Sequence, residues 1–262
     1  MERKRVGHFT TLNTKRKNLK NSEFDKSVSL TDSEYINEYV EDYNNSCKLL
    51  EDIGATVAVF GSARFDESNI YYKQAVEVSK KLVQNGFHII TGGSGGIMEA
   101  ANKGAYKVDD AHSIGFNLYL PFEQLSNNFA TIKDTLNSFS VRKHMLLKNS
   151  TSCIVLPGGF GTLDELFDVI TLVISRKFLP ISIHLIGCEF WQPLVDFIKK
   201  TLVNYKAVSE EETNILHVSD DLDEVVKKVK ENVKVYLDTM AEVGLKNTKR
   251  YKLIQKQFKD LR

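Results

Sequence analysis

The sequence predicts an α/β protein with a single doubly wound parallel sheet and helices on both faces. Several runs of four to six residues are almost wholly apolar, as expected for strands buried on both faces of a parallel sheet. Segments with apolar residues at helical spacing alternate with these runs along the chain. In a sheet of this kind, ligands bind beyond the carboxyl ends of the strands.

Capping residues, glycine breaks and apolar periodicity place the elements in order. Thr31 and Glu34 form a capping box that opens the first helix, and Gly54 follows its end. The predicted strands lie at 55–60, 87–90, 113–118, 152–156 and 181–186. One predicted helix lies at about 70–83, and three more begin near Ile97, Thr162 and Trp191. Two further helices are predicted at 222–233 and 251–261.

The two ends of the chain differ from this core. Residues 1–30 are polar and lack periodicity, which predicts a flexible basic arm, whereas 31–243 would form the Rossmann-like domain. Residues 244–262 predict a C-terminal amphipathic helical segment. The basic residues lack interleaved aromatics and a recognised binding fold, so we expect solvated or partner-contacting ends rather than nucleic-acid binding.

The composition is that of an ordinary soluble globular protein. Of its 262 residues, 42% are hydrophobic and 26% charged. No apolar stretch approaches the roughly 20 residues of a membrane helix. Three widely spaced cysteines without a C-x-x-C pattern predict free thiols. We therefore expect a cytoplasmic protein without membrane contact.

The most informative segment is a glycine-rich turn after the strand expected at 152–156. Pro157 ends that strand, and three glycines in the next four residues lead into the helix expected from Thr162. These glycines are Gly158, Gly159 and Gly161. Free N–H groups and the positive end of the helix dipole collect at a helix N-terminus, where glycine lets a phosphate come close. The turn is therefore predicted to bind an anion.

Glu165, in the first turn of that helix, has two interpretations. Thr162 and Glu165 match a capping box, which is a structural role. A carboxylate beside a bound sugar phosphate can also orient ribose hydroxyls, activate water or stabilise an oxocarbenium ion. Both interpretations can hold at once.

Two more glycine-containing loops follow predicted strands. Gly61 and Ser62 follow the first strand, and the segment 92–96 follows the second. Tight turns alone would explain one such cluster but explain three poorly. The motifs of dinucleotide and triphosphate binding are absent, and the six histidines lack metal-ligand spacing. No metal or organic cofactor is expected.

The run from Pro157 to Glu165 resembles the P-G-G-x-G-T-x-x-E signature of the Lonely Guy family, nucleoside-monophosphate phosphoribohydrolases often mislabelled as lysine decarboxylases. The resemblance spans about 55–233 and includes the triplet 141–143 (VRK) and the stretch 92–102. It implies a nucleotide-hydrolase domain that cleaves the N-glycosidic bond of a nucleoside 5'-monophosphate. AMP, as in an AMP nucleosidase, or a cytokinin riboside monophosphate would yield free base and ribose 5-phosphate, with adenine the first choice of base.

The resemblance also implies roles for individual residues. Arg142 and Glu165 would be the catalytic pair, and Lys143 would assist binding. The other implied substrate-binding residues are Gly61, Ser62, Gly93, Met98, Glu99, Gly158, Gly159, Gly161 and Thr162. An adjacent Arg–Lys pair is also typical of a solvated surface, and an acid in the first turn of a helix needs no function.

The chain departs from the family pattern at two places. Ser140 stands where many members have the His of an H-x-R-K form, which matches the longer-chain branch of the family. Ser94 and Gly95 stand where a third Gly and then Pro are expected. The serine adds a hydroxyl to this loop, and the glycine removes rigidity.

Two further questions stay open at this stage. A non-catalytic carrier of a nucleotide or of molybdenum cofactor, with the same fold, would need the glycine cradle but not both Arg142 and Glu165. The helix 162–174 is apolar on more than one face, and the stripes at 36–50 and 251–261 add apolar surface. We expect a homodimer or larger homo-oligomer, unless these helices pack on the chain's own core.

Overall fold

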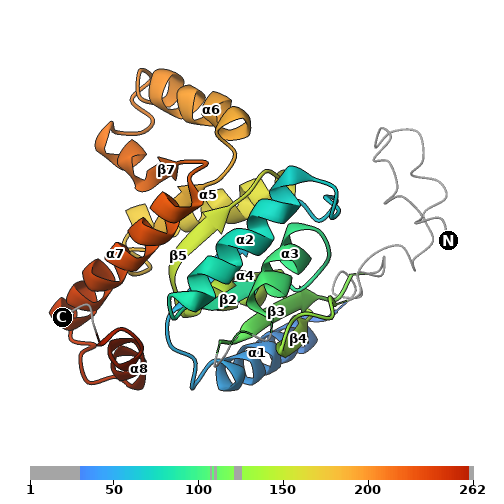
Figure 1. Ribbon diagram of the computed structural model, residues 1–262. Coiled ribbons are helices and arrows are strands. Elements are labelled where there is room, and N and C mark those ends of the chain that lie inside the picture. Colours follow the sequence, from blue (N-terminus) through green and yellow to red (C-terminus); the bar gives the residue numbers. More distant parts are fainter. Residues whose placement is uncertain (1–29, 107, 109–110, 121–125, 260–262) are drawn as a thin grey trace.

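The computed structural model describes residues 30–106, 108, 111–120 and 126–259. Within them, seven strands form one sheet in the order β4-β3-β2-β1-β5-β6-β7, and every neighbouring pair is parallel. Helices lie on both faces of this sheet (Figure 1). The predicted fold class is therefore confirmed. The expected basic arm lies, except for Leu30, outside the described residues.

The central strands match the apolar runs of the sequence, but two edge strands were not predicted. The strands are β1 Thr56–Phe60, β2 His88–Thr91, β3 Ser113–Leu118, β4 Ile132–Leu136, β5 Ser150–Val155, β6 Ser182–Leu185 and β7 Leu216–Val218. The missed strands, β4 and β7, form the two edges of the sheet. Neither is continuously buried, so neither has the wholly apolar sequence of a central strand.

Helices connect most consecutive strands, but among the described residues none lies between β3 and β4. They are α1 Asp32–Leu49, α2 Ile70–Gln84, α3 Ile97–Ala105, α4 Phe139–Lys148, α5 Phe160–Ile174, α6 Cys188–Phe197, α7 Leu222–Glu242 and α8 Lys249–Gln257. The capping box of Thr31 and Glu34 is confirmed at α1. A π-helix, Ile198–Leu202, continues α6. Among the described residues, no helix is long and apolar enough to cross a bilayer.

The sheet separates two apolar cores. On one face, α2, α3, α7 and α8 pack against alternate strand residues such as Val57 and Val59. On the other, α1, α4, α5 and α6 pack against the intervening residues, such as Ala58 and Phe60. This alternation follows from the two-residue period of a strand. The strand ends that carry the glycine loops are thereby held between two packed layers.

The C-terminal helix belongs to the first of these cores. Tyr251 and Ile254 of α8, and Phe258 directly after it, are buried there, beside residues of α2 and β1. The expectation that this stripe offers apolar surface to another subunit is therefore wrong, because the chain's own core covers it. The exposed side of α8 carries Lys252 and Lys256.

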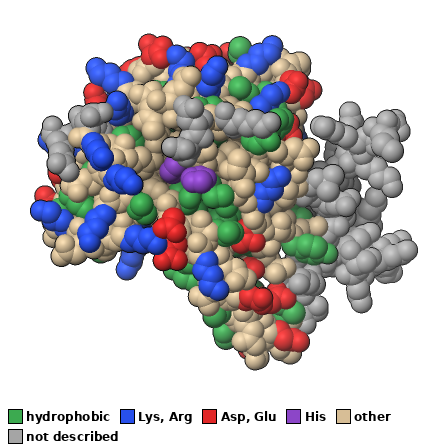
Figure 2. Space-filling model, turned by 60° about the horizontal axis from the view of Figure 1, so that its bottom comes forward, with side chains coloured by type: hydrophobic (Ala, Val, Ile, Leu, Met, Phe, Trp, Pro, Cys, Tyr) green, Lys and Arg blue, Asp and Glu red, His purple; other side chains and the backbone are tan. Residues whose placement is uncertain are grey.

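The charged surface is mixed. Figure 2 shows a face on which Lys and Arg side chains gather toward one side, with Asp and Glu side chains among them. Lys249 of α8, for example, forms ion pairs with Glu51 at 3.1 Å and Asp52 at 2.8 Å. Interspersed acids reduce the attraction of such a surface for a phosphate backbone.

Helices α1 and α5 keep apolar side chains outside both cores. Ile36 and Val40 of α1 are 59% and 49% exposed, and Phe160 of α5 is 90% exposed. Phe167 and Ile174 of α5 are also exposed. Packing within the chain thus leaves some apolar side chains of α5 uncovered on the described surface.

We predict that the protein associates through exposed apolar side chains of α1 and α5. Light scattering at micromolar concentration should give at least twice the chain mass of 29.7 kDa. Phe167→Glu should lower that mass because it places a charge in the apolar contact. The matched control is Val235→Glu, at an exposed apolar position on α7. A wild-type mass of one chain would contradict the prediction.

Candidate functional site

Three loops meet where adjacent strands of the sheet end. They follow β1 at Gly61, β2 at Gly92 and β5 at Leu156, and β2, β1 and β5 are neighbours in the sheet. The backbone N–H of Ser62 donates to the carbonyl of Pro157 at 3.0 Å, and that of Ile97 donates to the carbonyl of Ser62 at 2.9 Å. The polar rim predicted from the sequence is therefore one connected structure.

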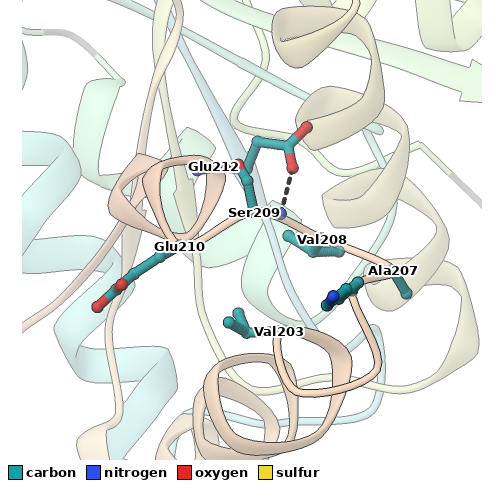
Figure 3. A pocket seen from close by; sticks show the side chains of 7 residues that line it. Val203, Ala207, Val208, Ser209, Glu210 and Glu212 are labelled. Atoms are coloured by element: carbon teal, nitrogen blue, oxygen red, sulfur yellow. Dashed lines mark hydrogen bonds between the residues drawn. The ribbon is translucent and has the colours of Figure 1, made fainter.

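Two hollows of the described surface lie elsewhere. One is lined by Val203, Lys206 and the loop 207–212 beyond the π-helix (Figure 3). The other lies between α1 and β4 and is lined by acids, among them Asp42 and Asp134. Neither contains a residue of the strand-end loops. Among the described residues, no cluster of His, Cys, Asp or Glu is arranged to hold a metal ion.

Helices α3 and α5 begin at this rim without a side-chain cap. Their N-cap residues are Gly96 and Gly159, and neither makes a side-chain capping bond. At α6, the Asp220 carboxylate accepts the N–H groups of Gly187 and Cys188. The other helices have side-chain caps, from Thr31, Asn69, Ser138, Asp221 and Thr248. The uncapped N–H groups of α3 and α5 suit an external anion.

The expected capping box of Thr162 and Glu165 is wrong. Helix α5 begins at Phe160, so Thr162 lies inside its first turn rather than at its N-cap. Thr162 is buried, and its hydroxyl lies so close to Gly158 that a side chain at Gly158 would collide with it. Glu165 is consequently not a capping residue, and its carboxylate is free for another partner.

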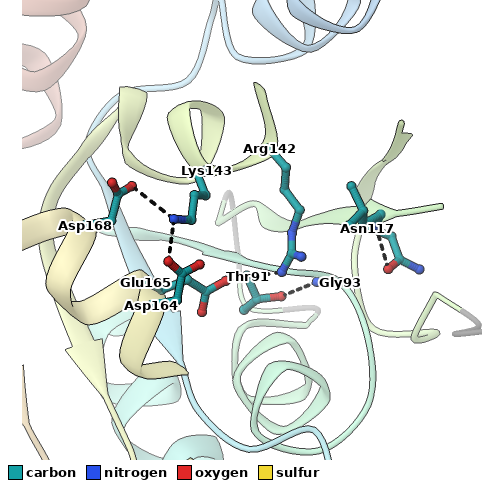
Figure 4. Close-up of polar contacts among 9 residues, drawn as sticks. Thr91, Gly93, Asn117, Arg142, Lys143, Asp164, Glu165 and Asp168 are labelled. Atoms are coloured by element: carbon teal, nitrogen blue, oxygen red, sulfur yellow. Dashed lines mark hydrogen bonds and ion pairs between the residues drawn. The ribbon is translucent and has the colours of Figure 1, made fainter. Parts of the chain in front are cut away.

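That partner is Arg142. Its Nη2 lies 3.3 Å from Oε1 of Glu165, and the two side chains are only 15% and 17% exposed. Figure 4 shows Arg142 reaching from α4 toward Glu165 on α5. The structure therefore brings together the two residues that the sequence assigned as a catalytic pair.

The surroundings of this pair perturb the carboxyl group. Burial raises the pKa of Glu165 to about 7, although the nearby Arg142 opposes that rise. The Nε atom of Arg142 is buried and has no hydrogen-bond partner among the described residues. At neutral pH, both protonation states of Glu165 are populated, as suits a group that exchanges a proton.

Gly92 makes the approach of Arg142 possible. A Cβ at Gly92 would collide with Nη2 of Arg142 and would lie 2.7 Å from Sδ of Met98. Met98 and Arg142 therefore both lie against Gly92. Gly93, the residue expected at the site, has a φ of +69°, which the turn requires. The position of Gly92 directly after the strand was the only signal for its role.

A buried polar network fixes the loop 92–96. The hydroxyl of Thr91 accepts the N–H of Gly93 at 3.0 Å and donates to Oδ1 of Asn102 at 2.6 Å. The Asn127 amide donates to the same Oδ1 and to the carbonyl of Ser94. Thr91, Asn102 and Asn127 support the site without having been predicted as site residues, because their partners are distant in sequence.

Lys143 and Glu99 make other contacts. Nζ of Lys143 lies 2.8 Å from Asp164 and 3.9 Å from Asp168, both on α5 (Figure 4). The Glu99 carboxylate accepts a hydrogen bond from the Tyr72 hydroxyl at 3.0 Å. None of these described contacts is with Arg142 or Glu165. They match the structural interpretation of these two residues.

The glycines at the start of α5 divide into two kinds. At Gly158, a Cβ would lie 2.9 Å from the backbone nitrogen of Ser62, so packing within the chain requires glycine there. At Gly159 and Gly161, a Cβ would meet no described atom within 4 Å. Neither has a positive φ. Close approach by a group from outside the described chain would explain glycine at both positions.

Comparisons with known proteins show the family of the chain. A family model described as "possible lysine decarboxylase" matches residues 98–229, which include Arg142 and Glu165. The cytokinin riboside 5'-monophosphate phosphoribohydrolase LOG of Oryza sativa subsp. japonica is 29% identical over 192 residues, covering 71% of this chain and 74% of that protein.

One solved structure shares the fold, and a second is reported for its similarity. A structural-genomics target solved by X-ray crystallography is 20% identical, with a TM-score of 0.52, covering 68% of this chain and 99% of that one. The molybdenum cofactor carrier protein of Chlamydomonas reinhardtii is 22% identical, with a TM-score of 0.49, covering 69% and 98%.

The raised pKa of Glu165 predicts a pH-dependent stability. Its value of about 7 lies above the ordinary 4.5, so the folded state favours the protonated form. The stability that this proton contributes is complete below pH 4.5 and is lost as the pH rises toward 7. Relative to Glu165→Gln, wild type should lose roughly 1–3 kcal/mol between these limits.

Urea unfolding of both proteins at pH 5 and pH 8 measures this difference. Asp164→Asn is the matched control, because Asp164 is more exposed and pairs with Lys143 instead. A difference between wild type and Glu165→Gln that does not change with pH would mean that the carboxyl group of Glu165 titrates ordinarily.

Proposed function

Because the chain belongs to the family described as "possible lysine decarboxylase", we propose, from that family's characterised relatives and from the site, that it hydrolyses the N-glycosidic bond of a nucleoside 5'-monophosphate. The products would be a free base and ribose 5-phosphate. The observation that carries the proposal is the buried Arg142–Glu165 pair beside two uncapped helix N-termini. The rice relative named as a phosphoribohydrolase supports the same class of reaction.

The family description itself fits the site less well. Decarboxylation of lysine with pyridoxal phosphate uses an enzyme lysine that forms a Schiff base with the cofactor. Lys143, the lysine next to the catalytic pair, is ion-paired with Asp164 and Asp168 on α5. The buried carboxylate–guanidinium pair instead suits cleavage of a glycosidic bond.

The 5'-phosphate would bind at the start of α5. Uncapped N–H groups and the helix dipole favour an anion there, and Gly159 and Gly161 leave room for it. Gly158 and Ser62 would hold this cradle in shape, since the two backbones are in close contact. Hydrogen bonds to a charged group contribute about 1.5–3 kcal/mol each.

The ribose would then lie toward Glu165, five residues into the same helix. Positive charge develops on the sugar as the base leaves, and the Glu165 carboxylate would stabilise it or activate the attacking water. Arg142 would keep part of the Glu165 population ionised and stabilise negative charge on the departing base. Adenine is the base we propose, on family similarity.

Incubation with AMP tests the proposal directly. Chromatography should show adenine and ribose 5-phosphate accumulating in equal amounts. Saturable AMP binding without products would favour the non-catalytic carrier, which needs the helix N-termini but not the ion pair. If the protein neither binds nor hydrolyses any member of a panel of nucleoside monophosphates, both functions are rejected.

Glu165→Gln should lower turnover of AMP at least about 100-fold, because the neutral amide cannot oppose the charge that develops on the sugar. Steady-state kinetics at pH 7 measures the loss. Asp164→Asn, one residue away and outside the pair, should stay close to wild type. Near-normal turnover by Glu165→Gln would remove the residue from the mechanism.

AMP should be a far better substrate than adenosine. Without the 5'-phosphate, the hydrogen bonds to the start of α5 are lost, and several bonds of 1.5–3 kcal/mol correspond to about a 1,000-fold loss in kcat/KM or more. Rates for the two substrates, compared at equal concentration, decide the point. Equal rates would place the phosphate away from α5 or leave it without a binding role.

A further inference from the structure

Helix α4 carries Arg142, and α1 packs beside it in the same apolar core. Helix α1 lies before residues 98–229, the part of the chain matched by the family model. We propose that Asp42 of α1 is a positioning residue, which holds the start of α4 so that Arg142 meets Glu165. This inference rests on the proposed function for its consequence in catalysis.

The contact of Asp42 with α4 is specific. Its Oδ2 accepts the backbone N–H groups of Asn137 and Ser138, both at 2.8 Å. Ser138 is the N-cap of α4, and its own hydroxyl reaches the N–H of Val141 only at 3.4 Å, which is long for a hydrogen bond. The Asp42 carboxylate is therefore the stronger anchor of this helix N-terminus.

A short chain of bonds leads from Asp42 to the site. The backbone N–H of Arg142 donates to the carbonyl of Ser138 at 3.0 Å, within the first turn of α4. The Arg142 guanidinium then meets Glu165 at 3.3 Å, which exceeds the 2.7–2.9 Å typical of a charge-assisted bond. A small shift of the start of α4 would therefore change this contact substantially.

Gly92 limits how far Arg142 can move in response. Its backbone lies against Nη2 of Arg142 so closely that a Cβ would not fit. The Arg142 guanidinium thus lies between the Gly92 backbone and Glu165. The position of α4 therefore decides whether the guanidinium can contact both. Catalytic groups displaced by about 1 Å can lose 100-fold in rate.

Other contacts between α1 and α4 lie further along both helices. The rings of Tyr43 and His144 are 5.6 Å apart, and Nζ of Lys148 lies 2.8 Å from Sγ of Cys47. At the far end of α4, the Asn149 amide donates to the carbonyl of Leu50 at 3.0 Å. These contacts hold the two helices together, so loss of Asp42 should move the start of α4 without separating it from α1.

Kinetics of Asp42 variants test the proposal. Asp42→Ala should lower kcat for AMP about tenfold or more with KM within about twofold, because Arg142 is displaced rather than removed. Asp42→Asn should restore kcat, since its amide oxygen can accept the same N–H groups. Ser46→Ala is the matched control: it removes a 2.9 Å bond from α1 to Asp134 of β4 and should leave kcat unchanged.

A double-mutant cycle separates positioning from general loss of structure. In the Arg142→Ala background, Asp42→Ala should cause no further loss of kcat, because the residue that it positions is gone. An undiminished tenfold effect in that background would overturn the proposal. If Asp42→Ala does not fold, Asp42→Glu replaces it, since it keeps the charge but displaces the contact. A Glu variant with normal kcat beside an impaired Asn variant would also overturn the proposal.

A measurement without substrate keeps this test apart from that of the proposed function. Arg142 holds the pKa of Glu165 below the value that burial alone would give. Carbon-13 NMR titration of Glu165, assigned with Glu165→Gln, should show a higher pKa in Asp42→Ala and no change in Ser46→Ala. An unchanged Glu165 titration in folded Asp42→Ala would refute the positioning role, whether or not AMP is hydrolysed.

Discussion

The site depends on a buried ion pair that joins two helices of the same layer. Arg142 on α4 and Glu165 on α5 are each about five-sixths buried, and burial of two charges is tolerated only where geometry and further polar contacts compensate for lost hydration. Here that compensation is incomplete. The pKa of Glu165 is raised to about 7, and Nε of Arg142 has no described partner. The pair is thus suited to react with a ligand rather than only to stabilise the fold.

The rest of the structure holds that pair beside the proposed anion site. The parallel sheet places the ends of β2, β1 and β5 side by side, so that the glycine loops and the starts of α3 and α5 converge. Gly92 admits the guanidinium, and the network around Asn102 fixes the loop that contains it. Because α3 and α5 lack side-chain caps, we propose that N–H groups at their starts, apart from that of Ile97, which donates to Ser62, bind a ligand.

Much of this architecture could be predicted from the sequence, for identifiable reasons. Central strands such as β1 and β3 are buried on both faces and so are apolar throughout, whereas β4 and β7 lie at the edges and carry no such signal. The start of α5 was misplaced because its N-cap is a glycine and its first residue, Phe160, is exposed, so neither resembles a helix start. The glycine turn that leads into α5 could be located because all its parts are adjacent in sequence.

The pairing of Arg142 with Glu165 was expected from family resemblance, because the number of residues between them does not tell how far apart their helices lie in space. Gly92 and Asn102 were missed for a related reason: what makes each necessary is a contact with another element. Asp42 is an extreme case, because its partners lie 95 and 96 residues away. Local patterns reveal where the chain turns, while the contacts that complete the site appear only in three dimensions.

A crystal structure of the Glu165→Gln variant with AMP bound would test the central claim most directly. The account predicts the phosphate within hydrogen-bonding distance of the backbone N–H groups at 159–162, and the ribose next to residue 165 and Arg142. AMP bound in the hollow beyond the π-helix, or with its phosphate away from the start of α5, would contradict it.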